Sequence, residues 1–232
     1  MSDEIVVNEQ GGKRSKIAGG IVKILGFSAK KQGGKTTAVN CVLDRVQCET
    51  DVIPFAWPLK EMFGKLFVPP DMAWDQDSED CKSQMLPMGK TVRQGLQWFG
   101  TDVCRKADPD CWVRAWKWSV SEAKQSEWPP VLILVPDVRF PNELAAVQEM
   151  GGHVIRLLRA PFEDQHESET ALDEVERFTW NDKVSKDRVV VWPDLAPEQY
   201  GQVFDACIDN RSMSIPEQHK AVLDLVTERR WV

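Results

Sequence analysis

The sequence IVKILGFSAKKQGGKTT, residues 21–37, carries the strongest structural signal in the chain. Residues 21–25 are mostly apolar and are bounded by glycines, which is typical of a buried strand. A loop rich in lysine and glycine follows, and from Thr37 to Val46 apolar residues recur at helical spacing. A strand, a Gly-rich loop, a Gly-Lys-Thr sequence and a helix in this order are typical of a phosphate-binding P-loop.

The residue types of this loop suit a nucleotide polyphosphate. Glycines allow several backbone N–H groups to converge on one point, and the N-terminus of the following helix adds a partial positive charge there. We expect Lys35 to reach the β- and γ-phosphates and the Thr36 hydroxyl to hold Mg²⁺. A lysine-rich surface turn in front of an ordinary helix is the structural alternative. The residues predicted to bind the nucleotide are Lys31, Gly33, Gly34, Lys35, Thr36 and Thr37.

Length and composition predict a soluble globular protein. The chain has 232 residues, of which 42% are apolar and 28% charged, so it can bury a sizeable core. We expect a cytoplasmic protein without a membrane partner, because no apolar run could span a bilayer and the N-terminus lacks a signal-peptide pattern. The net charge of −7 argues against stable nucleic-acid binding. The six cysteines include no Cys-x-x-Cys pair, which favours reduced thiols over a zinc site.

Strand-like and helix-like patterns alternate after a polar segment, residues 1–20, that we expect to be a flexible leader. Residues 21–232 therefore predict a single α/β domain with a mainly parallel sheet, whose ligand lies at the carboxyl ends of the strands. Residues 69–90 lack a period and predict a loop. We expect strands at residues 21–25, 51–56, 131–135, 153–158 and 189–192, and helices at 37–46, 58–63, 91–100, 109–120, 141–150, 197–207 and 216–230.

Five further stretches follow the P-loop in order along the chain. They are FAWPLKE at residues 55–61, RQGLQWFGTD at 93–102, DCWV at 110–113, DVRFPNE at 137–143 and HESE at 166–169. Together with the P-loop they resemble the bacteriophage-type deoxynucleoside monophosphate kinases, over roughly residues 21–205. The animal phosphomevalonate kinases look like more distant relatives.

The resemblance implies ATP- and Mg²⁺-dependent transfer of the γ-phosphoryl group to a deoxynucleoside 5′-monophosphate, in the host-cell cytoplasm if the protein is phage-encoded. It implies a P-loop NMP kinase-like, three-layer fold with a central parallel sheet, a helical acceptor-binding region at about residues 57–125 and a lid at about 160–187. Association into a homodimer is left open. The implied catalytic residues are Lys35, Arg93, Asp137 and Arg139, the acceptor-binding residues are Lys60, Arg93, Gln97, Gly100, Thr101, Trp112 and Asp137, and the metal-binding residues are Thr36 and Asp137.

Several of these residues also have a purely structural interpretation. Arg93 and Gln97 share a helix face, where they either bind the acceptor phosphate and base or are simply solvated. Trp112 either stacks on the acceptor base or belongs to the core. Asp137, which follows the apolar strand 131–135, either organises Mg²⁺ or caps a turn.

The remaining candidates are similarly open. Lys60 lies in the first turn of a helix, an unfavourable place for a cation, so it either has an anionic partner or is a surface lysine. Thr101 either contacts the acceptor or caps a turn. Ser168 and Glu169 belong to the lid or begin a helix as capping residues. The arginines that either bind phosphate or form surface ion pairs are Arg139, Arg156 and Arg159.

Three departures from the family pattern bear on function. Ala29 stands where a loop glycine is usual, Trp57 precedes Pro-Leu-Lys, and Trp192-Pro193 ends a strand where an asparagine is common. Alanine tolerates a positive φ poorly, which keeps open a non-catalytic module that only binds nucleotide. The other alternative is a kinase for a different small phosphorylated acceptor, similar to phosphomevalonate.

Overall fold

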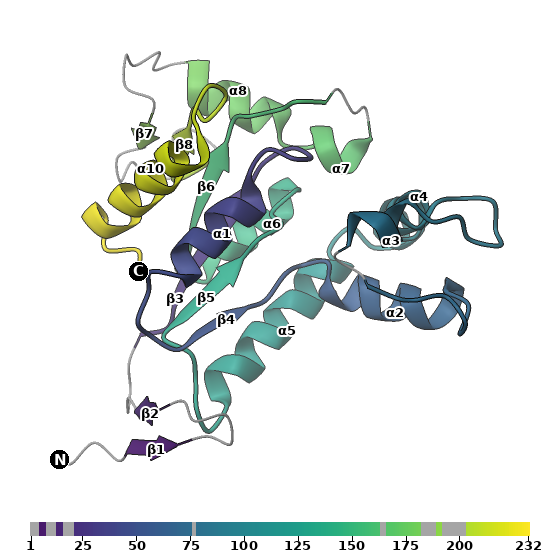
Figure 1. Ribbon diagram of the computed structural model, residues 1–232, viewed down its shortest axis with the longest axis horizontal. Helices are drawn as coiled ribbons and strands as arrows, with labels where there is room; N and C mark the ends of the chain where they lie inside the picture. Colours follow the sequence, from purple (N-terminus) through teal and green to yellow (C-terminus); the bar gives the residue numbers. More distant parts are fainter. Residues whose placement is uncertain are drawn as a thin grey trace.

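A six-stranded sheet, in the order β4-β5-β3-β6-β8-β7, forms the centre of the molecule (Figure 1). Five strands are parallel, and β7 pairs antiparallel with β8 at one edge. The predicted α/β fold with a mainly parallel sheet is therefore confirmed. The strands are β3 (Lys23–Ser28), β4 (Thr50–Val52), β5 (Leu132–Val135), β6 (His153–Leu157), β7 (Val189–Val191) and β8 (Ala206–Ile208). The structure, a computed structural model, describes residues 5–7, 13–15, 21–75, 78–162, 166–181, 189–191 and 203–232.

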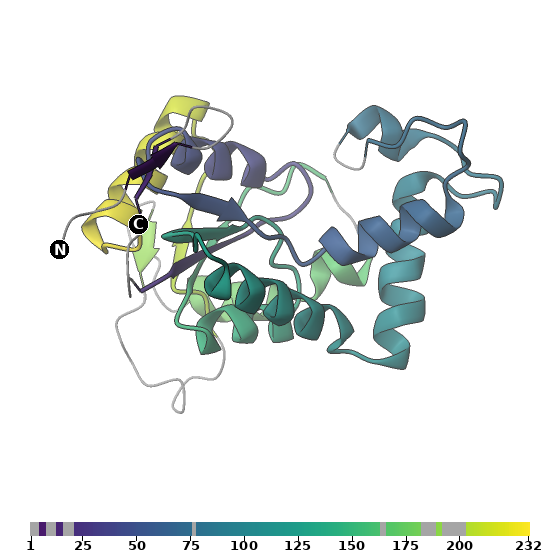
Figure 2. The same ribbon diagram turned by 90° about the horizontal axis from the view of Figure 1, so that it is seen from below.

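Helices cover both faces of this sheet, as Figure 2 shows. Alternate side chains of a strand point to opposite faces, so Leu25 and Phe27 of β3 pack into one core and Ile24 into another. The first core lies under α1 and α10, and the second under α5, α6 and the start of α8. The helices are α1 (Lys35–Leu43), α5 (Cys111–Gln125), α6 (Pro141–Glu149), α8 (Asp173–Asn181) and α10 (Ile215–Glu228).

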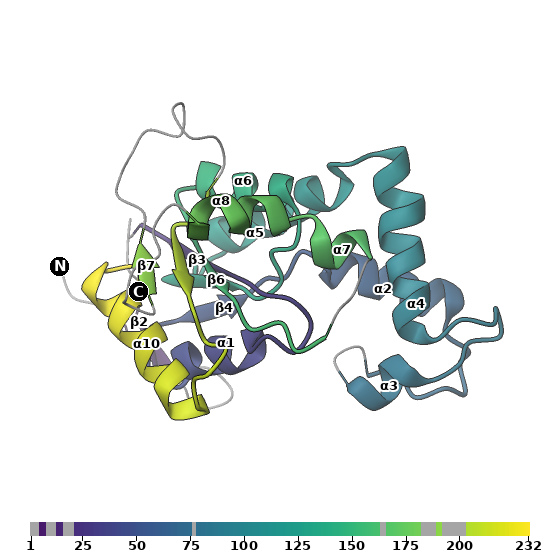
Figure 3. The same cartoon turned by 90° about the horizontal axis from the view of Figure 1, so that it is seen from above.

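A helical lobe projects beyond the carboxyl ends of the strands (Figures 1 and 3). It has a small core of its own around Phe63, Leu86 and Val92. A capping box between Thr91 and Gln94 begins one of its helices. The lobe contains α2 (Trp57–Phe67), α3 (Glu79–Ser83), α4 (Val92–Gln97) and the π-helix η1 (Trp98–Arg105).

Three local predictions in and next to this lobe were wrong. Gly100 does not end a helix, because η1 continues through it; a Cβ there would lie 2.7 Å from a methyl group of Leu59, so glycine allows η1 to approach α2 closely. The helix expected to begin at Pro109 begins instead at Cys111, after the N-cap residue Asp110. The short helix α3 lies in the segment 69–90 that was expected to be a loop.

The C-terminal part also differs from prediction. The end of the helix expected at residues 197–207 is wrong, because residues from Ala206 onward form the buried strand β8. The run at 189–192 does contain a strand, but it is the antiparallel edge rather than the last strand. Trp192-Pro193 lies outside the described residues. So does most of the leader at 1–20, of which two triplets, β1 (Ile5–Val7) and β2 (Lys13–Ser15), pair antiparallel.

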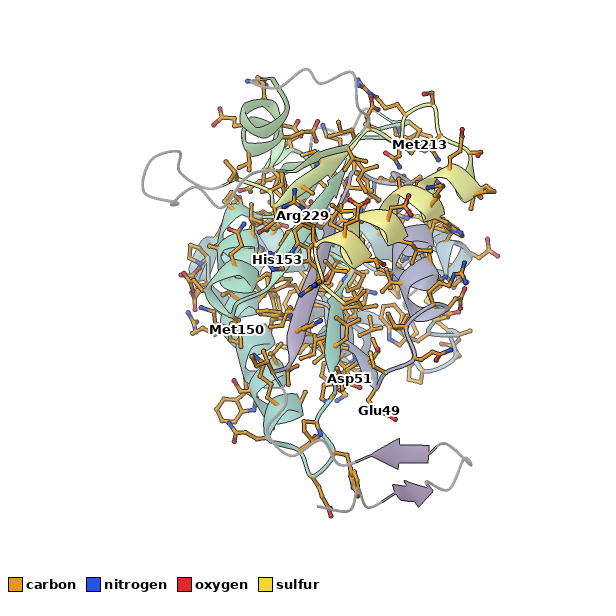
Figure 4. All side chains as sticks on the ribbon, turned by 90° about the vertical axis from the view of Figure 1, so that its left-hand side faces the viewer. Glu49, Asp51, Met150, His153, Met213 and Arg229 are labelled. Atoms are coloured by element: carbon orange, nitrogen blue, oxygen red, sulfur yellow. The ribbon has the colours of Figure 1, made fainter. Side chains whose placement is uncertain are left out.

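The C-terminus is anchored at the amino ends of the strands, away from the P-loop. Figure 4 shows α10 lying across the sheet between the labelled Met213 and Arg229, with His153 near its C-terminal end. The His153 ring stacks on Trp231 at 4.5 Å, and its Nδ1 lies 3.0 Å from a carboxylate oxygen of Asp205. His153 therefore helps to hold the C-terminal segment against the sheet. Among the described residues, no helix combines the length and apolarity needed to cross a membrane.

Candidate active site

The P-loop has the local structure that its sequence predicts. Strand β3 ends at Ser28, and α1 begins at Lys35 after Gly34, whose φ of 95° is strained for any other residue. Gly33 is required for a second reason, because a Cβ at this position would lie 2.5 Å from the backbone oxygen of Arg159. The two glycines therefore let the loop turn tightly into the N-terminus of α1.

Ala29 fits the loop without backbone strain. The described non-glycine residues with positive φ are Gln32 and Arg230, so Ala29 does not need the left-handed conformation that a glycine would allow. Its buried methyl group instead occupies space that the missing side chain of Gly33 leaves free, since a Cβ on Gly33 would lie 2.9 Å from it. The alanine at position 29, which kept a non-catalytic module open, is thus explained by local packing against Gly33.

Lys35 folds back onto its own loop. Its ammonium group donates to the backbone oxygens of Ala29 and of Lys30, the latter at 3.1 Å. Burial, followed by the charge of the neighbouring Arg139, lowers the pKa of Lys35 to about 7. Carbonyl oxygens compensate poorly for the lost hydration of a cation, so an anion bound in this loop would stabilise the charged lysine.

A cavity of about 220 Å³ lies between the P-loop side of the sheet and the helical lobe. Its polar wall carries the side chains of Lys82 and Arg105, and its apolar wall includes Phe55, Leu59 and Leu96. Charged and apolar groups that converge in this way are common in sites for small organic anions. The sequence-predicted residues that line it are Lys60, Arg93, Gln97, Gly100, Thr101, Trp112, Asp137 and Arg139.

Arg93 forms an ion pair with an exposed partner. Its Nη2 lies 2.5 Å from Oε2 of Glu79, whose side chain is 62% exposed. Exposed ion pairs contribute little free energy, so Arg93 can exchange Glu79 for a ligand at low cost. Gln97, one helical turn further along, lines the same cavity. The two residues therefore share a face that is turned to the cavity.

Trp112 combines the two interpretations that the sequence left open. Its side chain is buried, and its indole N–H donates to the backbone oxygen of Gly100 at 3.0 Å. The ring nevertheless forms part of the cavity wall. The bond to Gly100 fixes the ring in one orientation, which suits an aromatic surface for a planar ligand.

Asp137 ties the end of β5 to the start of α2. Its Oδ1 accepts from the N–H of Phe55 at 2.8 Å and its Oδ2 from the N–H of Ala56 at 2.9 Å. It therefore has the turn-capping role that was one of its interpretations. A carboxylate has about four acceptor positions, and Asp137 also lines the cavity, so it can still accept from water around a cation.

Glu143 and Arg105 form a buried pair that sequence reasoning missed. Arg105 is bound to one Glu143 oxygen, while the N–H groups of Arg139 and Phe140 donate to the other at 2.7 and 3.2 Å. Burial raises the pKa of Glu143 to about 7, although Arg105 opposes this shift. The Arg105 guanidinium also lies 3.8 Å from the centre of the Phe140 ring. This pair fixes the floor of the cavity.

Glu169 joins the cavity to the P-loop. Its carboxylate is bound to Arg139 on one side and accepts from the N–H of Lys31 at 2.7 Å on the other. It belongs to the short helix α7 (Glu167–Thr170). Ser168 and Glu169 therefore lie at the start of a helix, as one interpretation expected, but the N-cap residue is His166. The HESE stretch was the only sequence signal for this contact.

The other two arginine candidates lie apart from the cavity. Arg156 is 3% exposed and binds the Ser28 hydroxyl at 2.9 Å and Glu176 at 2.6 Å. Arg159 donates to the backbone oxygens of Asn210 and Met213. The surface ion pair considered for both is therefore wrong, because these arginines tie the ends of the strands to α8 and to the segment before α10.

Comparison with known proteins gives one distant relative. No model of a known protein family matches this chain. Over 201 residues the chain is 28% identical to a protein of Acanthamoeba polyphaga mimivirus named "Putative deoxynucleotide monophosphate kinase". The aligned part covers 82% of this chain and 97% of the viral protein. Similarity of this extent indicates that the two proteins share one fold over most of their length.

Proposed function

We propose that this protein transfers the γ-phosphoryl group of ATP to a deoxynucleoside 5′-monophosphate. The observation that carries the proposal is the bridge from Lys31 of the P-loop through Glu169 to Arg139 of the cation-lined cavity. A phosphate donor in the loop and a phosphorylated acceptor in the cavity would meet at this bridge. The name of the viral relative supports a kinase function in general, and the deoxynucleotide acceptor is the finer part of the proposal.

On the donor side, the loop N–H groups and Lys35 would hold the polyphosphate of ATP. Mg²⁺ requires few protein ligands when it binds with nucleotide phosphates. The exposed hydroxyl of Thr36 and the carboxylate of Asp137 are oxygen ligands of the kind it prefers. The ion would neutralise charge on the phosphates, while the chain's own residues align the two substrates.

On the acceptor side, Arg93, Lys60 and Arg139 would hold the monophosphate, because guanidinium and ammonium groups bind phosphate strongly. Gln97 and Thr101 would hydrogen-bond the sugar or the base. We propose residues 57–125 as the acceptor-binding region and residues 160–187 as the lid. Residues 76–77 of the first and residues 163–165 and 182–187 of the second lie outside the described residues. Closure of a lid would exclude water and so limit hydrolysis of ATP.

The proposal is tested with purified protein, Mg²⁺, labelled ATP and a panel of acceptors. The panel contains the deoxynucleoside monophosphates, the corresponding ribonucleotides and phosphomevalonate. We expect transfer to at least one deoxynucleotide. Transfer to phosphomevalonate alone would favour the other kinase class, and transfer to none of these acceptors would reject the proposal.

Replacing Arg93 by methionine should separate acceptor binding from ATP binding. We expect the KM for the monophosphate to rise about tenfold to a hundredfold, as loss of a charge-assisted hydrogen bond predicts. The KM for ATP and the melting temperature should change little, since the pair with Glu79 is exposed. Steady-state kinetics and a thermal melt measure both. Glu79→Gln is the matched control and should leave the monophosphate KM near wild type; an unchanged KM in Arg93→Met would contradict the assignment.

Binding of ATP should take up a proton above neutral pH. With its pKa lowered to about 7, Lys35 is about nine-tenths neutral at pH 8, whereas a bound polyphosphate favours the charged form. We therefore expect uptake of nearly one proton per ATP at pH 8, and an ATP affinity that falls as pH rises above 7. Calorimetric titrations in buffers of different ionisation enthalpy measure this uptake. Lys35→Met should abolish it, and its absence in the wild type would contradict the role given to Lys35.

A further inference from the structure

Two buried side-chain amides lie directly behind the P-loop. Asn210 follows strand β8 and Gln218 lies in the first turn of α10, and their exposed fractions are 0% and 1%. Both come from the C-terminal part of the chain, about 180 residues after the loop in sequence. Neither residue lines the cavity between the sheet and the helical lobe.

The amides bind the backbone of the two loop glycines. The Asn210 Nδ2 donates to the Gly33 oxygen at 2.9 Å and to the Gln218 Oε1 at 2.8 Å. The Gln218 Nε2 donates to the Gly34 oxygen at 3.0 Å. On its other side, the Asn210 Oδ1 accepts from the N–H of Arg159 at 2.8 Å, which ties the pair to the end of β6. The four side-chain atoms are therefore all engaged, and two of the bonds hold the loop.

These two bonds fix the direction of the N–H groups in the loop. A trans peptide unit is planar, and its C=O and N–H point in opposite directions. Holding the Gly33 oxygen therefore orients the N–H of Gly34, and holding the Gly34 oxygen orients the N–H of Lys35. Both N–H groups then point away from the amides, and we expect a phosphate to bind on that side of the loop.

Close packing shows that the amides and the glycines are matched in shape. A Cβ on Gly34 would lie 2.7 Å from the Gln218 Oε1 and 3.2 Å from the Asn210 Nδ2. Glycine has greater backbone freedom than any other residue type, and Gly34 is thus held through the peptide groups on both of its sides. Without these contacts the Gly34 oxygen would keep its bond from the N–H of Ala38 at 3.0 Å, but the peptide between Gly33 and Gly34 would be held less firmly. ATP would then have to order this part of the loop when it binds, at a cost in affinity.

We propose that Asn210 and Gln218 are positioning residues for the P-loop, which set the orientation of the N–H groups that receive the phosphates of the nucleotide. The proposal rests on the proposed function, because it assigns these residues to the same nucleotide site. It predicts that they act on nucleotide affinity without touching the nucleotide.

The decisive variant is Gln218→Met. Methionine has a similar length and no charge. The change removes the N–H that donates to the Gly34 oxygen and the oxygen that accepts from Asn210, without adding electrostatic repulsion. Asn210→Leu is the second variant. Gln47→Met, at an exposed position between the C-terminal end of α1 and β4, makes the same chemical change outside the P-loop and outside the proposed acceptor-binding region, and is the matched control. Binding of Mg·ADP and of the monophosphate is measured by calorimetry below the melting temperature of each variant.

We expect the Kd for Mg·ADP to rise about tenfold in Gln218→Met and at least as much in Asn210→Leu, as loss of one or more buried hydrogen bonds predicts. The Kd of both variants for the monophosphate should stay near wild type, and so should both Kd values of Gln47→Met. A folded Gln218→Met with a wild-type Kd for Mg·ADP would overturn the proposal even if its melting temperature fell, and so would equal weakening of both ligands. If Asn210→Leu does not fold, the Kd of Gln218→Met for Mg·ADP alone tests the proposal.

The wild type separates this proposal from the proposed function. A wild-type protein that binds Mg·ADP but phosphorylates no deoxynucleotide rejects the proposed function, while the comparison of variants still decides the role of the two amides. A wild-type protein that does not bind Mg·ADP rejects both.

Discussion

Replacing Lys35 by methionine is expected to lower kcat/KM for phosphoryl transfer by about a thousandfold or more, because the ammonium would stabilise the charge of the moving phosphoryl group. The same change should not destabilise the protein. The pKa of Lys35 is lower in the folded chain than in the unfolded one, so the charged lysine opposes folding. This penalty is complete below pH 7 and fades as pH rises toward the pKa of a free lysine.

The Lys35→Met variant should therefore melt at the wild-type temperature or above it, with the largest gain below pH 7. Residues that lower the stability of the fold but are needed for activity are typical of functional sites. Lys220→Met, at an exposed lysine on α10, is the matched control and should change neither property. Transfer within tenfold of wild type in the Lys35 variant, or an equal loss in the Lys220 variant, would contradict the assignment.

The sequence predicted the P-loop well because all of its determinants are contiguous. The apolar run of β3, the glycines at 33 and 34 and the helical spacing after Thr37 act over fewer than twenty residues. The packing of Ala29 against Gly33 was not predictable in the same way, since it depends on how closely the Arg159 backbone approaches. From the sequence, the expectation for Ala29 was that a loop glycine is replaced at the cost of a strained positive φ. The structure shows that Ala29 does not have a positive φ.

The residues proposed to bind the acceptor were selected by spacing and resemblance, and the structure shows that they line one cavity. What the sequence could not supply were contacts between distant segments. Glu169 meets Arg139 from 30 residues away, and Asn210 meets Gly33 from 177 residues away. The strand β8 was missed because a buried run of three residues has no period that separates a strand from a helix.

Replacing Arg139 by methionine is the second change with a large expected effect. Arg139 lines the cavity, its charge lowers the pKa of Lys35, and Glu169 holds it. We therefore propose that Arg139 contacts the phosphoryl group during its transfer from ATP to the acceptor, and expect kcat to fall about a hundredfold to a thousandfold in Arg139→Met. The variant also leaves the carboxylate of Glu169 buried without its cation, which costs about 3 kcal/mol of stability.

The loss of stability and the loss of catalysis can be separated with Glu169→Gln. Glutamine can still accept from the N–H of Lys31 but carries no charge, so the double variant Arg139→Met/Glu169→Gln should regain most of the lost stability. If Arg139 acts on the phosphoryl group, the double variant stays as inactive as Arg139→Met, and kinetics with thermal melts on all four proteins show the two effects dissociating. If transfer returns together with stability, Arg139 serves only to dock α7 on the loop.

The single variant Glu169→Gln tests the same site from the other side. The Glu169 carboxylate binds a P-loop N–H and a guanidinium, two groups that also suit a phosphate oxygen. An incoming polyphosphate would compete with this carboxylate and be repelled by it. We therefore expect ATP to bind Glu169→Gln at least as tightly as wild type. Weaker binding would mean that Glu169 supports the nucleotide-bound loop, and that Arg139 reaches the phosphates only while Glu169 holds it.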